Sequence, residues 1–126
     1  MACDIIETNE APAAIGPYSQ AVASGSMLFV SGQLGMNPET GELGSSDFQS
    51  QTEQAMINLH NIIQAGGFDL SDVMSVDVFI TDMKRFAEFN EIYLKYFFSH
   101  KPARAIVEVS ALPKGAVVEI KCVAKR

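Results

Sequence analysis

Arg104 and Glu119 are the residues whose types and spacing best suit chemistry on a small acidic ligand. Side chains alternate along predicted strands at 105–109 and 117–124, which places both residues on the sheet face away from the helices. A guanidinium is a planar fork that can bind a carboxylate through two hydrogen bonds. A carboxylate on the adjacent strand can hold or activate water. A structural ion pair at a subunit interface would use the same residues, and spacing alone favours that plainer interpretation.

Four further residues could belong to a ligand site. Tyr18 follows the Gly16-Pro17 bend, where a tyrosine is more often a packing residue than a catalytic one. Ser31 and Gly32 end an apolar strand, and a glycine there lets a ligand approach backbone N–H groups, although a simple turn explains the same residues. Glu108 is predicted on the face of Arg104 and serves equally well as a surface or interface charge.

Metal and covalent chemistry have little support. His60 is expected on the exposed side of a helix and His100 in a loop, without a cysteine cluster at ligand spacing, so a metal site is improbable. Cys122 lies in an apolar run and is expected to act as a small buried hydrophobe, with Cys3 far from it in sequence. There is no Gly-rich phosphate loop and no Gly-x-Ser-x-Gly elbow.

Composition limits the class of partner. The 126 residues, of which 48% are hydrophobic and 19% charged, are enough for one globular domain. Nine basic against fifteen acidic residues give a net charge of −6, which argues against nucleic acid and anionic membranes as main partners. No apolar run reaches the roughly 20 residues of a membrane span, and residues 1–5 do not resemble a signal peptide. We therefore expect a cytoplasmic protein.

The elements that must position these residues begin with two helices. The first is predicted from an apolar stripe with a Ser46–Gln49 capping box before it and Gly66-Gly67 as its stop. The stripe comprises Phe48, Thr52, Ala55, Met56, Leu59, Ile62 and Ile63. The second helix is predicted to begin near Asp82 as N-cap. Its aromatic side comprises Phe86, Phe89, Tyr93 and Phe97.

The remaining segments alternate as strands do. A strand at 18–23 is expected to pair with the apolar run at 27–30, and another covers 75–81. Strands at 105–109 and 117–124 flank a turn at 112–115. The order predicts an α+β fold with a sheet of five or six strands and two helices.

Two helices can cover only one face of such a sheet. The other face would expose Ile106, Val117, Val123 and side chains of the 27–30 strand. An apolar patch of this kind is unusual on a monomer, so the pattern predicts self-association through that face.

Three stretches and one shorter motif resemble the RidA/YjgF family of reactive intermediate deaminases, also known as L-PSP endoribonucleases. They are APAAIGPYSQ at 11–20, FVSGQ at 29–33, the block PARAIVEV…LPKG…VEI at 102–120 and NEIY at 90–93. The resemblance covers nearly all of 1–126 as a single domain. It implies a chorismate-mutase-like fold and a homotrimer in which the sheets form a central barrel and the sites lie between subunits.

The resemblance also implies an activity. Members hydrolyse reactive enamine and imine intermediates, 2-iminobutanoate and 2-iminopropanoate, to 2-oxo acids and ammonia, without cofactor or metal. It implies that Arg104 clamps the substrate carboxylate, Glu119 orients water and Tyr18 lines the pocket. The implied substrate-binding residues are Ser31, Gly32, Asn90 and Ile106.

Two positions depart from the family pattern. Ile106 stands where a cysteine is frequent, which leaves only backbone contacts there, and Lys121 replaces a frequent acidic residue.

Two other functions stay open. The family name carries an endoribonuclease and translation-inhibitor function, against which the acidic composition argues. A local basic patch of Lys101, Arg104 and Lys114 could still serve RNA. The third alternative is a non-catalytic trimer that binds small carboxylates.

Overall fold

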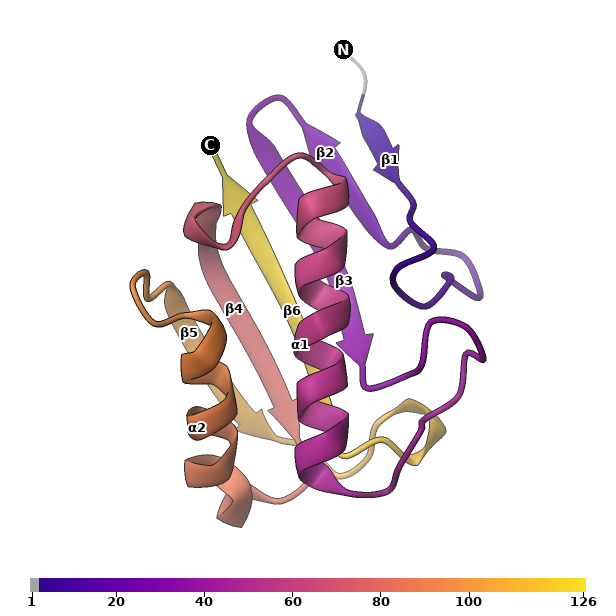
Figure 1. Cartoon of the computed structure of the whole chain (residues 1–126), viewed down its shortest axis with the longest axis vertical. Coiled ribbons are helices and arrows are strands. Elements are labelled where there is room, and N and C mark those ends of the chain that lie inside the picture. Colours follow the sequence, from indigo (N-terminus) through magenta and orange to yellow (C-terminus); the bar gives the residue numbers. More distant parts are fainter. Residues whose placement is uncertain (1–2) are drawn as a thin grey trace.

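The computed structural model describes residues 3–126 as one mixed sheet with two α-helices (Figure 1). The strands are β1 (Asp4–Ile6), β2 (Ala21–Ser24), β3 (Met27–Leu34), β4 (Val73–Ile80), β5 (Ala103–Glu108) and β6 (Val118–Lys125). The helices are α1 (Phe48–Ala65) and α2 (Phe86–Tyr96). The fold class predicted from the sequence, α+β with a sheet of five or six strands and two helices, is confirmed.

The order of strands in the sheet is β1-β2-β3-β6-β4-β5. All neighbours are antiparallel except β4 and β5, which run parallel. Figure 1 shows both helices on the same side of the sheet, with α1 in front of β3 and β6 and α2 beside it, toward β5. The core lies between this helix layer and the sheet, and no helix within residues 3–126 covers the opposite face.

Helix α1 forms where its apolar stripe predicts, but its cap is different. Asp47, and not Ser46, is the N-cap, because its carboxylate accepts the Ser50 backbone N–H at 2.9 Å. The helix ends as expected near the glycine pair, where Gly67 has a φ of 82°. Thr52 donates its hydroxyl to the Phe48 carbonyl at 2.8 Å, so this polar residue is satisfied inside the buried stripe.

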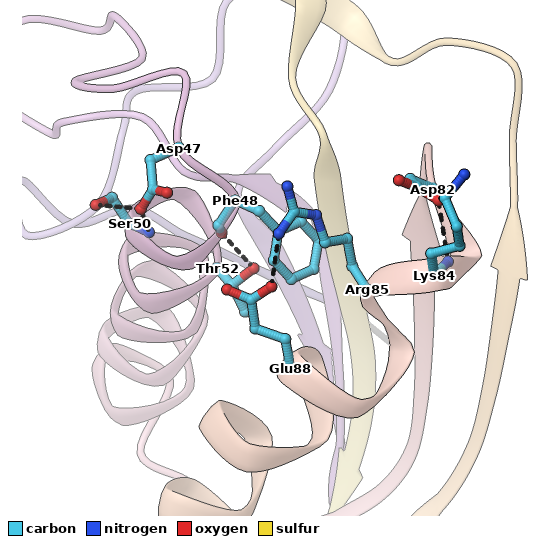
Figure 2. A network of polar contacts seen from close by, with 8 residues as sticks. All are labelled: Asp47, Phe48, Ser50, Thr52, Asp82, Lys84, Arg85 and Glu88. Carbon is cyan, nitrogen blue, oxygen red and sulfur yellow. Dashed lines mark hydrogen bonds and ion pairs between the residues drawn. The ribbon is translucent and has the colours of Figure 1, made fainter.

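Helix α2 begins later than the sequence predicts. Asp82 caps a short 3₁₀ turn, Met83–Arg85, by accepting the Lys84 N–H, and α2 itself starts at Phe86. Figure 2 shows how this start is tied to α1: Arg85 donates to Glu88 at 3.0 Å, and its guanidinium lies 5.8 Å from the centre of the Phe48 ring.

The predicted strands are present, with changed ends. The strand expected at 18–23 starts only at Ala21, because the preceding residues belong to a loop. The three-residue strand β1 was not predicted, since so short an edge strand carries no readable alternation. The turn at 112–115 is confirmed, with Lys114 at φ 61° and Gly115 at φ 70°.

The uncovered face of the sheet carries apolar side chains, as expected, beside the ion pair of Lys121 and Asp77, although two of the apolar residues expected there lie elsewhere. Phe29 is 48% exposed and pairs with Val22 and Val123, and Val107 is 44% exposed on β5. Ile106 instead pairs with the buried Val78 and packs against the core on the helix side, and Val117 also packs against the core. The uncovered face therefore has exposed apolar side chains, as predicted, but some of them differ from the residues that the sequence suggested.

Two absences concern residues 3–126. No helix in this range is long and apolar enough to cross a membrane. No group of three His, Cys, Asp or Glu side chains in it could hold a metal ion.

Cys122 is 3% exposed, and burial raises the pKa of its thiol to about 12, so it packs as a small hydrophobe. Cys3 is exposed and unpaired.

Candidate active site

A cleft of about 920 Å³ opens beside the end of β3 on the uncovered side of the sheet. Its walls come from the segments at 13–18 and 36–42 and from the turn before β6. Four of the seven site residues expected from the sequence line it: Tyr18, Ser31, Gly32 and Glu119. The structure therefore brings these four together within one chain.

Glu119 and Gly32 are in direct contact at the bottom of this arrangement. Glu119 lies on β6, opposite Leu34 of β3 and Phe79 of β4, and its side chain fills the space above Gly32. A Cβ built on Gly32 would lie 2.3 Å from Glu119 Oε2 and 2.8 Å from Cδ. The register of β3 shifts between Val30 and Gln33, which is the irregularity that brings Gly32 under the carboxylate.

The Glu119 carboxylate is half-buried and has no hydrogen-bond or ion-pair partner among the residues that the structure describes. Burial raises its pKa above the ordinary value of 4.5. A carboxylate in this state is a better proton acceptor than an exposed glutamate, and its free oxygens can bind water. The site thus contains a half-buried carboxylate without a structural partner.

Ser31 and Tyr18 close one side of the cleft. The Ser31 hydroxyl donates to the Ser19 carbonyl at 2.6 Å, and the Ser31 N–H donates to the Gln20 carbonyl at 2.9 Å. The Tyr18 N–H donates to the carbonyl of Gly16, whose φ of 120° a residue with a side chain rarely adopts. Tyr18 is half exposed, so its phenol remains free for a ligand.

Gln20 is a residue whose role the sequence did not reveal. Its amide is buried and donates to the carbonyls of Thr8, Ala11 and Pro12, while its oxygen accepts the Thr8 N–H at 2.7 Å. These four bonds fold residues 8–12 against the strand that follows Tyr18. A buried glutamine looks like any other glutamine in a sequence, so only the three-dimensional contacts identify it.

Lys114 is a second residue whose place in the cleft the sequence did not predict. It lines the cleft, and its Nζ lies 3.7 Å from the carboxylate of Glu42 on the facing loop. Among the cleft-lining residues it is the single cation, against the carboxylates of Glu39, Glu42 and Glu119. The cleft of one chain is therefore acidic.

Arg104 is not on the face of Glu119, so the expectation of a shared face is wrong. Arg104 pairs with Val76 of β4, which is fully buried under the helices, and β4 separates β5 from β6. The two charged side chains consequently lie on opposite faces of the sheet. Residues 103–108 have apolar side chains on both faces of the strand: Ala and Val on one face, and Ile106 on the other. The alternation alone therefore does not show which face is buried.

The environment of Arg104 is aromatic. Its guanidinium carbon lies 4.7 Å from the centre of the Tyr93 ring, 5.9 Å from Phe89 and 6.0 Å from Phe86, all on α2. Asn90 is on the same helix, and Ile106 follows two residues along β5. These three expected site residues lie on α2 and β5, outside the cleft that holds Glu119.

Glu108 has a structural task. It accepts the Met83 backbone N–H at 2.8 Å and thereby ties the end of β5 to the turn before α2. The contact supports the interpretation of Glu108 as a surface charge rather than a residue of the ligand site.

Comparison with known proteins places this architecture. Residues 8–126 match the family model described as Endoribonuclease L-PSP. The human 2-iminobutanoate/2-iminopropanoate deaminase is 45% identical over 95% of this chain and 88% of its own. A putative endoribonuclease from Thermotoga maritima has a TM-score of 0.95 at 49% identity, covering 98% of this chain and 97% of that one.

One solved relative carries a ligand. The Escherichia coli protein TdcF, described with bound serine, has a TM-score of 0.92 at 44% identity and covers 98% of both chains. Because the family model spans almost the whole chain and the relatives share its fold at high identity, the chain belongs to the endoribonuclease L-PSP family, the RidA/YjgF family.

Proposed function

We propose that this protein hydrolyses 2-imino acids, such as 2-iminobutanoate and 2-iminopropanoate, to 2-oxo acids and ammonia. The observation that carries the proposal is the Glu119 carboxylate, half-buried over Gly32 in a cleft and without a partner of its own. The name of the human relative supports the same reaction. The serine in TdcF supports a ligand of amino-acid size.

The chemistry needs one positioned water. A protonated imine carbon is already electrophilic, so the protein has to hold water on one side of it and remove a proton. Glu119 accepts that proton as the water oxygen bonds to carbon. Glu119 then returns the proton to the amine nitrogen of the carbinolamine that has formed. The C–N bond breaks and ammonia leaves, while Glu119 accepts the proton of the carbinolamine hydroxyl as the carbonyl forms.

The cleft of one chain contains one cation, Lys114, which already lies 3.7 Å from the Glu42 carboxylate, so the substrate carboxylate requires a second cation. The cleft carries more carboxylates than cations, and Arg104 lies at the far edge strand, with no ion pair among residues 3–126. We therefore extend the proposal to a homotrimer in which Arg104 of one copy completes the Glu119 cleft of the next. The uncovered apolar face is the surface for such association.

The test combines single variants with their mixture. Ammonia release is measured with imine generated in situ by an added amino-acid dehydratase, for wild type, Arg104→Ala and Glu119→Gln. Each variant is expected to lose at least tenfold in rate. Arg104→Ala removes one partner of the charge pair with the substrate carboxylate, which costs about 2–5 kcal/mol, and Glu119→Gln removes the general base, which contributes about 10²–10⁴-fold. The two inactive variants are then denatured, mixed in equal amounts and refolded.

The mixture reports whether a site uses two copies. If it does, about one quarter of the sites in randomly mixed trimers carry both native residues, and about one quarter of the activity returns. No recovery from the mixture would refute the shared site. Wild-type protein that binds 2-oxo acids but releases no ammonia above background would refute the deaminase and leave a carboxylate-binding protein.

A further inference from the structure

Arg104 has no partner of opposite charge among residues 3–126. It lies on β5, an edge strand, and its side chain is exposed. Arg85 is paired with Glu88, whereas no carboxylate within residues 3–126 pairs with Arg104. An exposed arginine side chain that nothing holds keeps rotamer entropy of about 2 kcal/mol, which a ligand would have to overcome on binding.

Three rings of α2 supply the missing support. Phe86, Phe89 and Tyr93 follow one another at helical spacing, and their ring centres lie 6.0, 5.9 and 4.7 Å from the guanidinium carbon. All three distances fall within the range of about 6 Å in which a cation is attracted to an aromatic ring. Contact with rings uses none of the five N–H donors of Arg104, so these remain available for a carboxylate.

Tyr93 is the ring that can act as the fixed support. It is 9% exposed and packs between Phe89 and Phe97, with ring centres 5.5 and 4.9 Å away. Its hydroxyl is buried and has no hydrogen-bond partner among the described residues. Burial raises the pKa of the phenol to about 12, so the ring stays neutral beneath the cation. Tyr93 therefore contacts Arg104 through the face of its ring, and its hydroxyl takes no part in this contact.

We propose that Tyr93, assisted by Phe86 and Phe89, is a positioning residue that holds the Arg104 guanidinium in the orientation in which it binds a carboxylate. The inference rests on the proposed function for the identity of that carboxylate, the one on a 2-imino or 2-oxo acid. It adds that the strength of this contact is set from α2, by side chains that need not touch the ligand.

The first experiment observes Arg104 without any ligand. In the assembled protein, the Nε–H group of Arg104 is assigned by comparison with Arg104→Lys, and its order parameter is measured by ¹⁵N relaxation. We expect an ordered Nε–H in wild type and in Tyr93→Phe, which keeps the ring and removes only the unpartnered hydroxyl. In Tyr93→Leu the order parameter should fall to that of an exposed side chain.

The second experiment is a double-mutant cycle on the binding of pyruvate, measured by calorimetry. Tyr93→Leu is expected to weaken binding about fivefold in the native background, as the loss of one partly exposed cation–ring contact would. In the Arg104→Ala background the same change should have no further effect. Phe86→Leu, at an exposed position, gives a smaller loss by the same route and preserves the core.

The outcomes separate this inference from the proposed function. An unchanged Nε–H order parameter in Tyr93→Leu overturns the positioning role, as does a loss of binding that is equal in both backgrounds, since that would reflect a damaged core. A protein that shows the expected ordering and cycle but releases no ammonia loses the proposed reaction and keeps the positioning role.

Discussion

Replacing Gly32 by alanine tests the geometry of the cleft more directly than any change to Glu119 itself. The new Cβ would lie 2.3 Å from Glu119 Oε2, whereas ordinary contacts begin near 3.4 Å. The carboxylate therefore has to move by about 1 Å, and a displacement of that size costs a catalytic group about a hundredfold in rate. The backbone is expected to stay in place, because the atoms nearest the new Cβ all belong to the flexible side chain of Glu119.

Two other glycines provide matched controls. At Gly44 nothing lies within 4 Å of a built Cβ, so Gly44→Ala should leave both rate and stability unchanged. At Gly35 a Cβ would lie 2.4 Å from the Gln51 backbone oxygen, so Gly35→Ala should destabilise the fold by about 1–3 kcal/mol.

The assay is ammonia release beside thermal unfolding for the three variants. We expect Gly32→Ala to keep the midpoint of wild type and lose about a hundredfold in kcat/KM. Gly32→Ala with wild-type rate would show that the position of the Glu119 carboxylate does not matter, and the role proposed for it would be withdrawn. A midpoint as low as that of Gly35→Ala would show that the contact is structural.

Three more outcomes follow from the contacts. Val123→Glu, on the uncovered face, should yield inactive monomers in analytical ultracentrifugation. Leu94→Glu, on the exposed side of α2, is the control and should leave a trimer. A trimeric Val123→Glu protein would contradict the proposed assembly through the uncovered face. Because burial raises the pKa of Glu119, the folded protein binds this proton more tightly than the unfolded chain, and ionisation destabilises the fold above the folded-state pKa. Glu119→Gln should therefore raise the unfolding temperature more at neutral pH than below 4.5, the ordinary pKa of this carboxyl, and an equal gain at both would be evidence against the shift. Gln20→Glu places an anion 2.8 Å from the Pro12 carbonyl and should lower stability by about 1–3 kcal/mol in urea denaturation, a cost that a wild-type midpoint would disprove.

Local patterns predicted the elements because their causes are local. The apolar stripe from Phe48 to Ile63 needs only helical spacing to be recognised, and the turn before β6 needs only its Pro and Gly. The helix starts were less predictable. Ser46 and Asp47 are both good caps, and only the observed bond to the Ser50 N–H decides between them.

The sequence predicted four of the residues that line the cleft, but it did not predict where the other three candidate residues lie. The cleft residues Tyr18, Gly32 and Glu119 come together as expected. The face of Arg104 depends on which side of β5 the helices cover, and that depends on its pairing with β4. This is a contact between segments distant in sequence, and the mixed alternation of residues 103–108 contains no information about it.

The position of β6 has a consequence for how the chain folds. This strand follows every other described element in the sequence, yet it lies in the middle of the sheet, between β3 and β4. Until it inserts, β1-β2-β3 and β4-β5 have no strand between them, and each exposes an unpaired edge. During synthesis the chain therefore passes through a stage in which five strands exist but cannot form one sheet. At that stage the apolar strand β3 is open to pairing with another molecule, and aggregation competes with folding.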